Sequence, residues 1–369
     1  MKPRDIPSTS REAFFALAHL CEPADRLINK ALARQSPERV IQDLLTGALK
    51  SASQETFVAR FSEFNLAREL EFSERIGASF LTRGEVGWPR QLGALGPQEP
   101  WVLWSLGSAD FRLLAVQSLA IVGTRACTAY GQRVAHDWAA EMSDSAVTVV
   151  SGGAIGIDIA AHRGALSVGA PTLCVVAGGV QARYPATNEN VFHQIMDSGV
   201  IVSESPPQQA PRRQRFLTRN RIIAALSQAT LIVEASSRSG TASTAAWAES
   251  IHRPILGVPG SVYSAASEGI HAMMAEARAI LVHSPRDVLA LLNIHHDPVP
   301  SRESGTDWRD LSQPELDVWE SIPKKGEALA SDLAVRCSLP LPNVMAILTE
   351  LTLKDMVKTD GVAWRRAFF

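Results

Sequence analysis

Six short apolar runs, each followed by a cluster of small, polar or proline residues, constrain the fold more than any other feature of the chain. The runs are residues 119–122, 147–150, 172–176, 200–202, 231–233 and 255–258. Segments of helical length separate them, and this alternation is typical of a parallel sheet covered by helices. The carboxyl ends of parallel strands lie along one edge of such a sheet, where ligands bind. We therefore expect the polar clusters to converge in space.

The remaining sequence predicts smaller parts around this core. Residues 1–83 have apolar positions at helical spacing and predict a helical N-terminal domain, whereas residues 84–117, rich in proline and tryptophan, predict an irregular connector. The α/β core spans residues 118–292. A polar stretch over 293–307 predicts a linker, and residues 308–369 predict three helices and a terminal hairpin, the pattern of a winged helix.

The charge balance limits the kind of partner. The chain has 36 Lys+Arg against 38 Asp+Glu, a formal net charge of −2, so a polyanion must be bound by a local cluster of cations. No run of about eighteen apolar residues occurs, so the sequence predicts no membrane-spanning helix. The four cysteines are scattered and lack CxxC spacing, which favours reduced thiols. We expect a cytoplasmic protein without a membrane partner.

Two glycine-containing loops predict an anion site. Residues 151–158 join a strand to a helix, where glycines let a ligand approach the backbone and unpaired N–H groups favour an anion. For this loop alone, a tight structural turn is an equal alternative. Ser239-Gly240-Thr241 repeats the arrangement before a second helix, where a hydroxyl either caps the helix or holds a phosphate. Two such loops on one sheet edge favour the anion site.

An arginine-rich segment follows the fourth predicted strand. It contains Arg212, Arg213, Arg215, Phe216, Arg219, Asn220 and Arg221. Guanidinium groups bind phosphate bidentately, and an aromatic ring or an arginine plane stacks on a base. A charge run is more often a solvated face, but this run lies at the expected ligand-binding edge of a nearly neutral protein. Its position therefore favours polyanion binding.

Several familiar sites have no support in the sequence. GxxxxGK[ST] does not occur, and Gly123-Thr124-Arg125 stands where a dinucleotide-binding protein has GxGxxG. No HExxH pattern occurs among the nine histidines. His162, in the helix after the first glycine loop, is interpreted as a packed or capping residue. We expect no catalytic residue, no metal and no cofactor.

Taken in order, the motifs of residues 84–292 resemble the DNA-processing protein A family (DprA, also called Smf). They include Gly123-Thr124-Arg125, Tyr184-Pro185, Arg219-Asn220-Arg221, Ser239-Gly240-Thr241 and Val258-Pro259-Gly260. The resemblance implies an extended Rossmann-like core that binds single-stranded DNA, forms a homodimer and loads the RecA recombinase during natural transformation or recombination. No catalytic reaction is implied.

The resemblance also implies which residues line the DNA-binding pocket. Carried over by position, they are Arg125, Gly152, Gly153, Gly156, Arg219, Asn220, Arg221, Ser239, Gly240 and Thr241. Four positions depart from the family pattern. Ile155 replaces an arginine, Leu217 a proline, Gln181 an aspartate and His271 an asparagine. Because Ile155 carries no charge, this departure concerns the affinity of the pocket for DNA and not the location of the pocket.

Other functions stay open. Related Rossmann-like phosphoribohydrolases cleave nucleoside monophosphates with a PGGxGTxxE motif, but Thr244 stands here in place of the glutamate, so the general acid/base is missing. A general repair adaptor is a third hypothesis. In the winged helix, residues 342–354 offer Lys354 as their one cation, so this domain contacts either duplex DNA or another protein.

Overall fold

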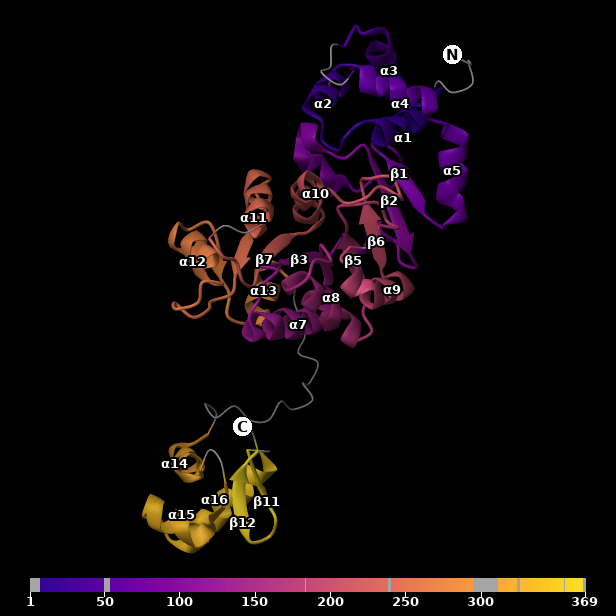
Figure 1. Ribbon diagram of the computed structural model, residues 1–369. Coiled ribbons are helices and arrows are strands. Elements are labelled where there is room, and N and C mark those ends of the chain that lie inside the picture. The colour runs from indigo at the N-terminus through magenta and orange to yellow at the C-terminus, as the bar shows by residue number, and fades with distance from the viewer. Residues whose placement is uncertain are drawn as a thin grey trace. The chain divides into compact units, whose positions relative to one another are not determined.

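The computed structural model describes residues 7–49, 54–182, 184–237, 240–294, 311–323, 326–354 and 356–367. The chain divides into two compact units, Met1–His295 and His296–Phe369, hereafter the main unit and the terminal unit (Figure 1). Most of the linker predicted over 293–307 lies outside the described residues. Within the described part of the chain, no helix is both long and apolar enough to cross a membrane.

A nine-stranded sheet, counted over the described residues, forms the centre of the main unit. Its order is β1-β2-β6-β5-β4-β3-β7-β8-β9, in which β2 pairs antiparallel with both β1 and β6 and all the other pairs are parallel. The strands are β1 (Ser79–Thr82), β2 (Val102–Gly107), β3 (Ser118–Val122), β4 (Thr148–Ser151), β5 (Thr172–Val175), β6 (Val200–Ser203), β7 (Ala229–Ile232), β8 (Ile255–Gly257) and β9 (Ile280–Leu281). All six predicted runs are strands, so the predicted α/β fold is confirmed.

Helices cover both faces of the sheet, because its strands are apolar on both sides. Leu119 and Ile121 pack in one layer, covered by α7 (Ala129–Asp144), α8 (Ile157–Ser167), α9 (Glu189–Ser198) and α13 (Pro285–Leu291). Ala120 and Val122 pack on the opposite face, covered by α6 (Phe111–Leu114), α10 (Arg213–Leu226), α11 (Thr241–Ser250) and α12 (Glu268–Ala275). Figure 1 shows α7 and α8 on one side of the strands and α10 and α11 on the other.

The segment 84–117 is more regular than its sequence predicts. It contains a 3-10 segment, Arg90–Gln98, and the strand β2, which extends the sheet by pairing with β6, Trp104 opposite Ser203. The tryptophans that indicated an irregular connector are core residues, since Trp101 and Trp104 are both buried. The sequence hides β2 because Pro97 and Pro100 lie just before it and both of its faces are apolar.

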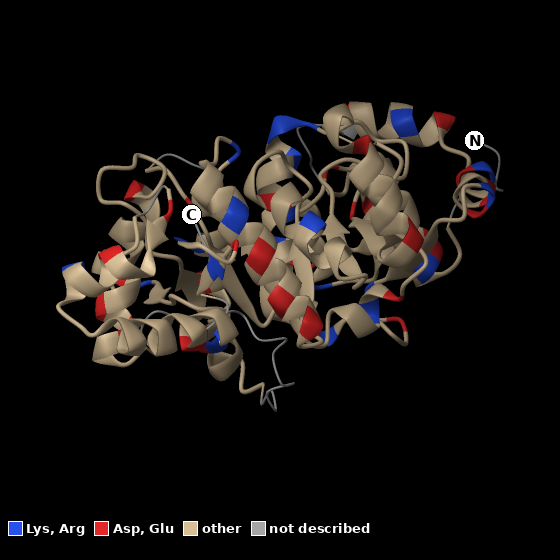
Figure 2. Ribbon diagram, turned by 90° about the horizontal axis from the view of Figure 1, so that it is seen from below, with Lys and Arg blue, Asp and Glu red and all other residues tan. Residues whose placement is uncertain are grey.

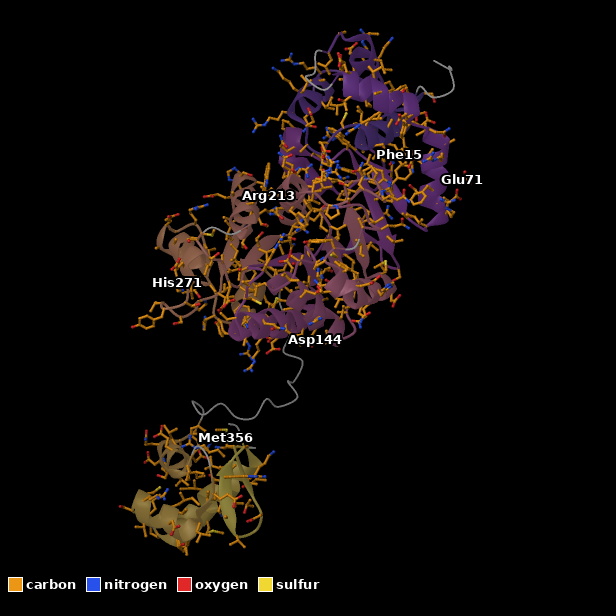
Figure 3. The ribbon with its side chains drawn as sticks, in the orientation of Figure 1. Phe15, Glu71, Asp144, Arg213, His271 and Met356 are labelled. Carbon is orange, nitrogen blue, oxygen red and sulfur yellow. The ribbon has the colours of Figure 1, made fainter. Side chains whose placement is uncertain are left out.

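The N-terminal residues form a helical layer beside β1 and β2. Its helices are α1 (Ser10–Leu20), α2 (Arg26–Leu32), α3 (Pro37–Thr46), α4 (Gln54–Glu63) and α5 (Leu66–Arg75). Thr9 and Glu12 form a capping box at the start of α1, which satisfies free N–H groups there. The ring of Phe15, labelled in Figure 3, lies 5.6 Å from that of Trp104 between centroids. This aromatic contact joins the helical layer to the sheet.

In its described residues, the terminal unit contains three helices and a small antiparallel sheet. Its elements are α14 (Gln313–Ser321), β10 (Ala328–Leu329), α15 (Ala330–Cys337), α16 (Leu341–Leu353), β11 (Val357–Thr359) and β12 (Ala363–Arg366), with the sheet order β10-β12-β11. Val318, Leu333 and Leu348 are fully buried in its core, and Met356, labelled in Figure 3, packs with them. Lys354 pairs with Glu315.

Candidate functional site

A pocket of about 400 Å³ lies where β3 and β7 are neighbours. The chain leaves these two strands in opposite directions across the sheet, and such a switch point opens a crevice at the carboxyl edge. The loops after β3, β4 and β7 and the starts of α8 and α11 contribute to its walls, together with α10. The lining residues include Gly123, Thr124, Arg125, Ala154, Asp158, Phe216, Arg219, Asn220, Ser236, Gly240, Thr241 and Thr244.

The predicted convergence of polar clusters is therefore seen for three of the six strands. The clusters after β5 and β6 contact each other instead, since the Ser203 hydroxyl donates to the Gly178 carbonyl at 2.6 Å and the Gly179 N–H donates to the Gln209 carbonyl at 2.8 Å. The cluster after β8 is held by Tyr130, whose hydroxyl donates to the Pro259 carbonyl at 2.7 Å. These contacts fix the surroundings of the pocket.

The glycine loop after β4 is shaped by close packing. Gly156 has φ +89°, and a Cβ there would overlap the Thr124 carbonyl, so only glycine lets this loop approach the loop after β3. A Cβ at Gly152 would overlap the Arg219 guanidinium, and one at Gly153 would press on Phe192. The three predicted glycines thus bring the loop against its neighbours.

Asp158 is the residue of this loop that the sequence did not single out. Its buried carboxylate accepts hydrogen bonds from the backbone N–H groups of Gly152 and Ala154. Burial raises the pKa of the Asp158 carboxyl, while the nearby Arg219 guanidinium opposes that rise. An internal carboxylate therefore occupies part of the anion site expected from the loop backbone, and Ile155 leaves the loop without a cation.

Arg219 links the loop to the sheet. It is 5% exposed, and its Nη1 donates to the carbonyls of Gly152, at 2.8 Å, and Val175. Its Nε donates to the Asn220 side chain at 3.3 Å. Burial lowers the pKa of the Arg219 guanidinium, and Asp158 counteracts this effect. Arg219 lines the pocket, but several of its donors are already satisfied within the protein.

Two other arginines of the predicted phosphate-binding run are held inside the protein. Arg221 is 0% exposed, and its Nη1 and Nη2 donate to the Glu204 carboxylate at 2.8 and 2.6 Å. Arg215 is also buried and donates to Glu22 through Nε and Nη2, at 2.8 and 2.9 Å. Neither residue offers a free guanidinium at the surface, because Glu22 holds Arg215 and Glu204 holds Arg221 on different sides of α10.

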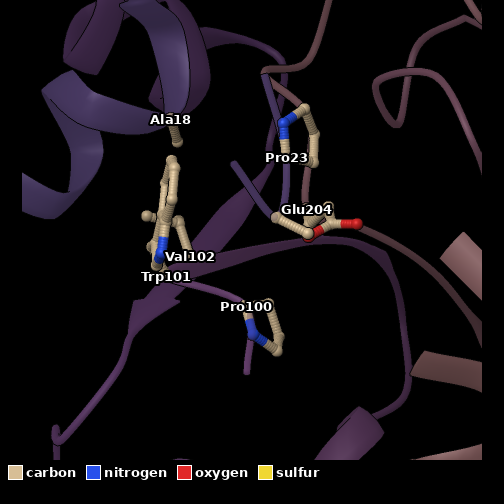
Figure 4. A pocket seen from close by; sticks show the side chains of 7 residues that line it. Ala18, Pro23, Pro100, Trp101, Val102 and Glu204 are labelled. Atoms are coloured by element: carbon tan, nitrogen blue, oxygen red, sulfur yellow. The ribbon is translucent and has the colours of Figure 1, made fainter. Parts of the chain in front are cut away.

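The helical layer seals the Arg221–Glu204 pair from solvent. Pro23, Pro100 and Trp101 surround Glu204 at a void of about 10 Å³ (Figure 4). A void of that size holds about one water molecule. The pair is therefore an internal contact that fixes α10 against the sheet.

The exposed cations gather at the start of α10 and after β3. Arg213, labelled in Figure 3, begins α10; it is exposed and has no ion pair among the described residues. Arg212 is also exposed, with Glu22 at 3.1 Å from its Nη1. The Arg125 guanidinium carbon lies 5.0 Å from the centroid of the Phe216 ring, a cation–π contact that leaves its N–H donors available.

The start of α11 supplies hydroxyl groups. Thr241 and Thr244 are buried and line the pocket, and neither hydroxyl has a hydrogen-bond partner among the described residues. The Asn220 side chain donates to the Gly240 carbonyl at 3.3 Å. Ser239 lies outside the described residues. The sequence did not single out Thr244 as a pocket residue, although its spacing of one helical turn from Thr241 was a signal.

The remaining predictions concern the absence of a metal site, the role of His162 and the distribution of charge. Within the ranges that the structure describes, no group of three or more His, Cys, Asp or Glu side chains could hold a metal ion. His162 is buried and hydrogen-bonded to the Thr172 hydroxyl at 2.8 Å, and burial lowers its pKa to about 3. Basic and acidic residues are interspersed along the ribbon in Figure 2, in keeping with the net charge of −2.

Two of the four departures from the family pattern lie at the surface near the pocket, and two have structural partners. Ile155 and Leu217 are about half exposed, and Leu217 lines the pocket. Gln181 donates its N–H to the Pro207 carbonyl at 3.0 Å, a bond that any residue other than proline can make. His271 accepts a hydrogen bond at Nε2 from the Gly260 N–H at 3.4 Å.

The fold and the pocket define a Rossmann-like protein with a pocket at the switch point of its sheet, the place where open α/β sheets bind ligands. Comparison with known proteins gives the family. Residues 79–293 match the model of DNA recombination-mediator protein A, and the chain belongs to this family. It is 34% identical to the putative DNA processing protein DprA of Mycobacterium tuberculosis, covering 98% of this chain and 95% of that protein. The family is one of DNA-processing proteins and is not known as a family of enzymes.

Solved structures agree with this assignment. The X-ray structure of DNA processing protein A from Streptococcus pneumoniae matches with a TM-score of 0.65 and 27% identity, over 76% of this chain and 97% of that one. A Helicobacter pylori structure, which concerns the single-stranded DNA binding mode of DNA processing protein A, matches with a TM-score of 0.53 and 29% identity, over 59% and 97%.

Proposed function

We propose that this protein is a single-stranded-DNA-binding recombination mediator that protects incoming DNA during natural transformation or recombination. The observation that carries the proposal is the exposed Arg125 guanidinium, which lies over the Phe216 ring at the rim of the pocket. A guanidinium and an aromatic ring together bind a phosphate and a base, the two parts that every nucleotide presents. The single-stranded DNA binding of the H. pylori relative supports the same ligand.

The pocket residues have different roles in this proposal. Arg125, Arg213 and Arg212 neutralise phosphates, because their guanidinium groups are exposed. Arg219, Asn220, Gly240 and Thr241 line the pocket wall. Gly152, Gly153 and Gly156 do not line it but shape the loop after β4, and Ser239 lies outside the described residues. Arg215 and Arg221 act indirectly, since their ion pairs with Glu22 and Glu204 hold α10 in place.

Binding of a fluorescent oligonucleotide across a salt series tests this division of roles. On single strands the slope of log K against log salt is about −0.7 per neutralised phosphate. The double variant R125A/R213A is expected to lose about 1.4 of that slope. R163A/R286A is the matched control, because it removes two exposed arginines without an ion pair among the described residues. An equal slope for both double variants would contradict the proposed site.

We further propose that the protein forms a homodimer through the β9 edge of the sheet. Ile280 and Leu281 are about half exposed there, and β9 has a free strand edge. Apolar residues on an unpaired edge strand favour association with another chain. Sedimentation of the intact chain tests this, and a protein that stays monomeric at micromolar concentration would contradict it.

Loading of the RecA recombinase belongs to the same proposal. A mediator must release its strand to the recombinase, and a modest number of phosphate contacts suits such an exchange. The assay is strand exchange by RecA on DNA coated with a single-strand-binding protein. We expect stimulation by the intact chain and none by R125A/R213A, whereas equal stimulation by both would contradict the role of this site. We place this activity in the cytoplasm.

For the terminal unit we propose a winged helix that contacts a protein. In α16, Lys354 is paired with Glu315, while Leu341, Met345 and Leu353 are exposed. An apolar exposed face is poorly suited to phosphates and base edges, whereas it suits a protein surface. Binding of duplex DNA that disappears when residues 308–369 are deleted would contradict this proposal.

A nucleotide-binding or nucleoside-monophosphate-cleaving enzyme is the alternative. The hydroxyls of Thr241 and Thr244, which have no hydrogen-bond partner among the described residues, favour it, since they can bind a terminal phosphate. Thr244 cannot serve as the general acid or base that cleavage requires. Release of free base from a nucleoside monophosphate, absent in T241V, would establish this alternative.

A further inference from the structure

Tyr184 lies in the segment between β5 and α9, and hydrogen bonds tie this segment to both neighbours of the pocket. On one side, the Asn188 side chain donates to the Gly153 carbonyl at 3.2 Å. On the other side, the Gln181 N–H donates to the Pro207 carbonyl at 3.0 Å, in the loop that leads to α10. The two contacts fix the segment between the glycine loop and the arginine-rich helix.

The ring of Tyr184 continues the contact between Arg125 and Phe216. Its centroid lies 5.9 Å from that of Phe216, edge to face, and its side chain is 52% exposed. The tyrosine hydroxyl has no hydrogen-bond partner among the described residues. Arg125, Phe216 and Tyr184 thus form a row, hereafter the aromatic row, in which the last member has a free face and no internal polar contact.

We propose that Tyr184 stacks on a second base of the bound strand, next to the base held at Phe216 and Arg125. This inference rests on the proposed function. Base stacking on aromatic side chains suits any sequence, because every base has a π-face. The proposal adds a second nucleotide to the pocket and names the side chain that holds it.

The spacing within the row gives the proposal a consequence for strand selection. Stacked bases follow each other at about 3.4 Å along a strand. The two rings are 5.9 Å apart, so bases that use both rings must be unstacked from each other. A duplex keeps its bases stacked and paired, whereas a single strand can separate them. The aromatic row therefore selects single-stranded DNA by geometry.

Three variants separate stacking from the other roles that Tyr184 could have. Y184A removes the ring, and Y184F keeps the ring while removing the hydroxyl. Y263A is the matched control, because Tyr263 is 96% exposed in the loop between β8 and α12 and does not line the pocket. Thermal unfolding shows whether each variant keeps the fold. If Y184A does not fold, the proposal is tested with the intact chain and Y184F on strands with and without bases.

The experiment compares an oligothymidylate with an oligonucleotide of the same length that lacks bases. We expect Y184A to bind the oligothymidylate about 5- to 150-fold more weakly than the intact chain does, the range for one stacked base. Y184F and Y263A should stay within about twofold. On the strand without bases, Y184A and the intact chain should bind equally, and the salt slope of Y184A should be unchanged.

Several results would overturn the inference. Equal weakening on both strands would mean that Tyr184 positions a phosphate contact, and weakening by Y184F would mean that the hydroxyl is the binding group. A strand without bases that the intact chain binds as tightly as oligothymidylate would exclude stacking even without Y184A. Failure of the proposed function looks different, because then the intact chain binds neither strand or R125A/R213A keeps the full salt slope.

Discussion

The buried pair of Arg221 and Glu204 gives a quantitative prediction, because the two form an ion pair at 2.6 Å and have almost no exposed surface. Removing one member leaves the other charge buried and uncompensated, which costs about 3–5 kcal/mol. For a domain of this size, about 2–4 °C of melting temperature corresponds to each kcal/mol. We therefore expect R221M to lower the melting temperature of the main unit by roughly 10 °C.

The double variant R221M/E204L removes both charges and provides the control. Replacing a whole buried pair by apolar side chains of similar volume is often neutral, so the double variant should recover most of the lost stability. Urea unfolding followed by tryptophan fluorescence measures both effects, since Trp101 lies beside the pair. DNA binding by the folded double variant should stay within a few-fold of normal. A stable R221M that loses DNA binding would refute the structural role and return Arg221 to the phosphate-binding set.

Three further predictions concern other contacts. G152A should weaken DNA binding and lower stability by about 1–3 kcal/mol, because the added methyl overlaps the Arg219 guanidinium; urea unfolding and anisotropy measure the two effects. L281R should convert a dimer to a monomer in sedimentation without loss of the fold, since the residue lies on an exposed strand edge. Because burial lowers the pKa of His162 to about 3, the unfolded chain binds a proton there that the folded chain does not. Stability contributed by the neutral ring is present above pH 6.5 and falls by about 3 kcal/mol toward pH 4, and H162N should reduce that loss.

The sequence predicted the parallel part of the fold because buried parallel strands are short apolar runs with polar ends. It could not predict β2, because Pro97 and Pro100 lie just before the strand and prolines usually mark loops. The antiparallel pairing of Trp104 with Ser203 depends on a strand a hundred residues away. Contacts of that kind are set by tertiary structure and leave no local periodicity.

For the site, too, the sequence could not predict the contacts of individual side chains that depend on tertiary structure. The arginine-rich run is visible in the sequence, but its division into exposed Arg213 and buried Arg221 depends on which face of α10 meets Glu204. Asp158 was hidden because its carboxylate faces its own loop. Thr244 stands where related enzymes have a glutamate, and only the structure shows that its side chain lines the same pocket as that of Thr241.

The most direct test of the central claim is a titration of the intact chain with a fluorescent single strand in the presence of excess unlabelled duplex, repeated over a salt series. If Arg125, Arg213 and Arg212 neutralise three phosphates, the single strand is bound despite the competitor, with a log–log slope of about −2. Equal displacement by duplex, or binding that does not depend on salt, would contradict a single-strand mediator with its cations at this pocket.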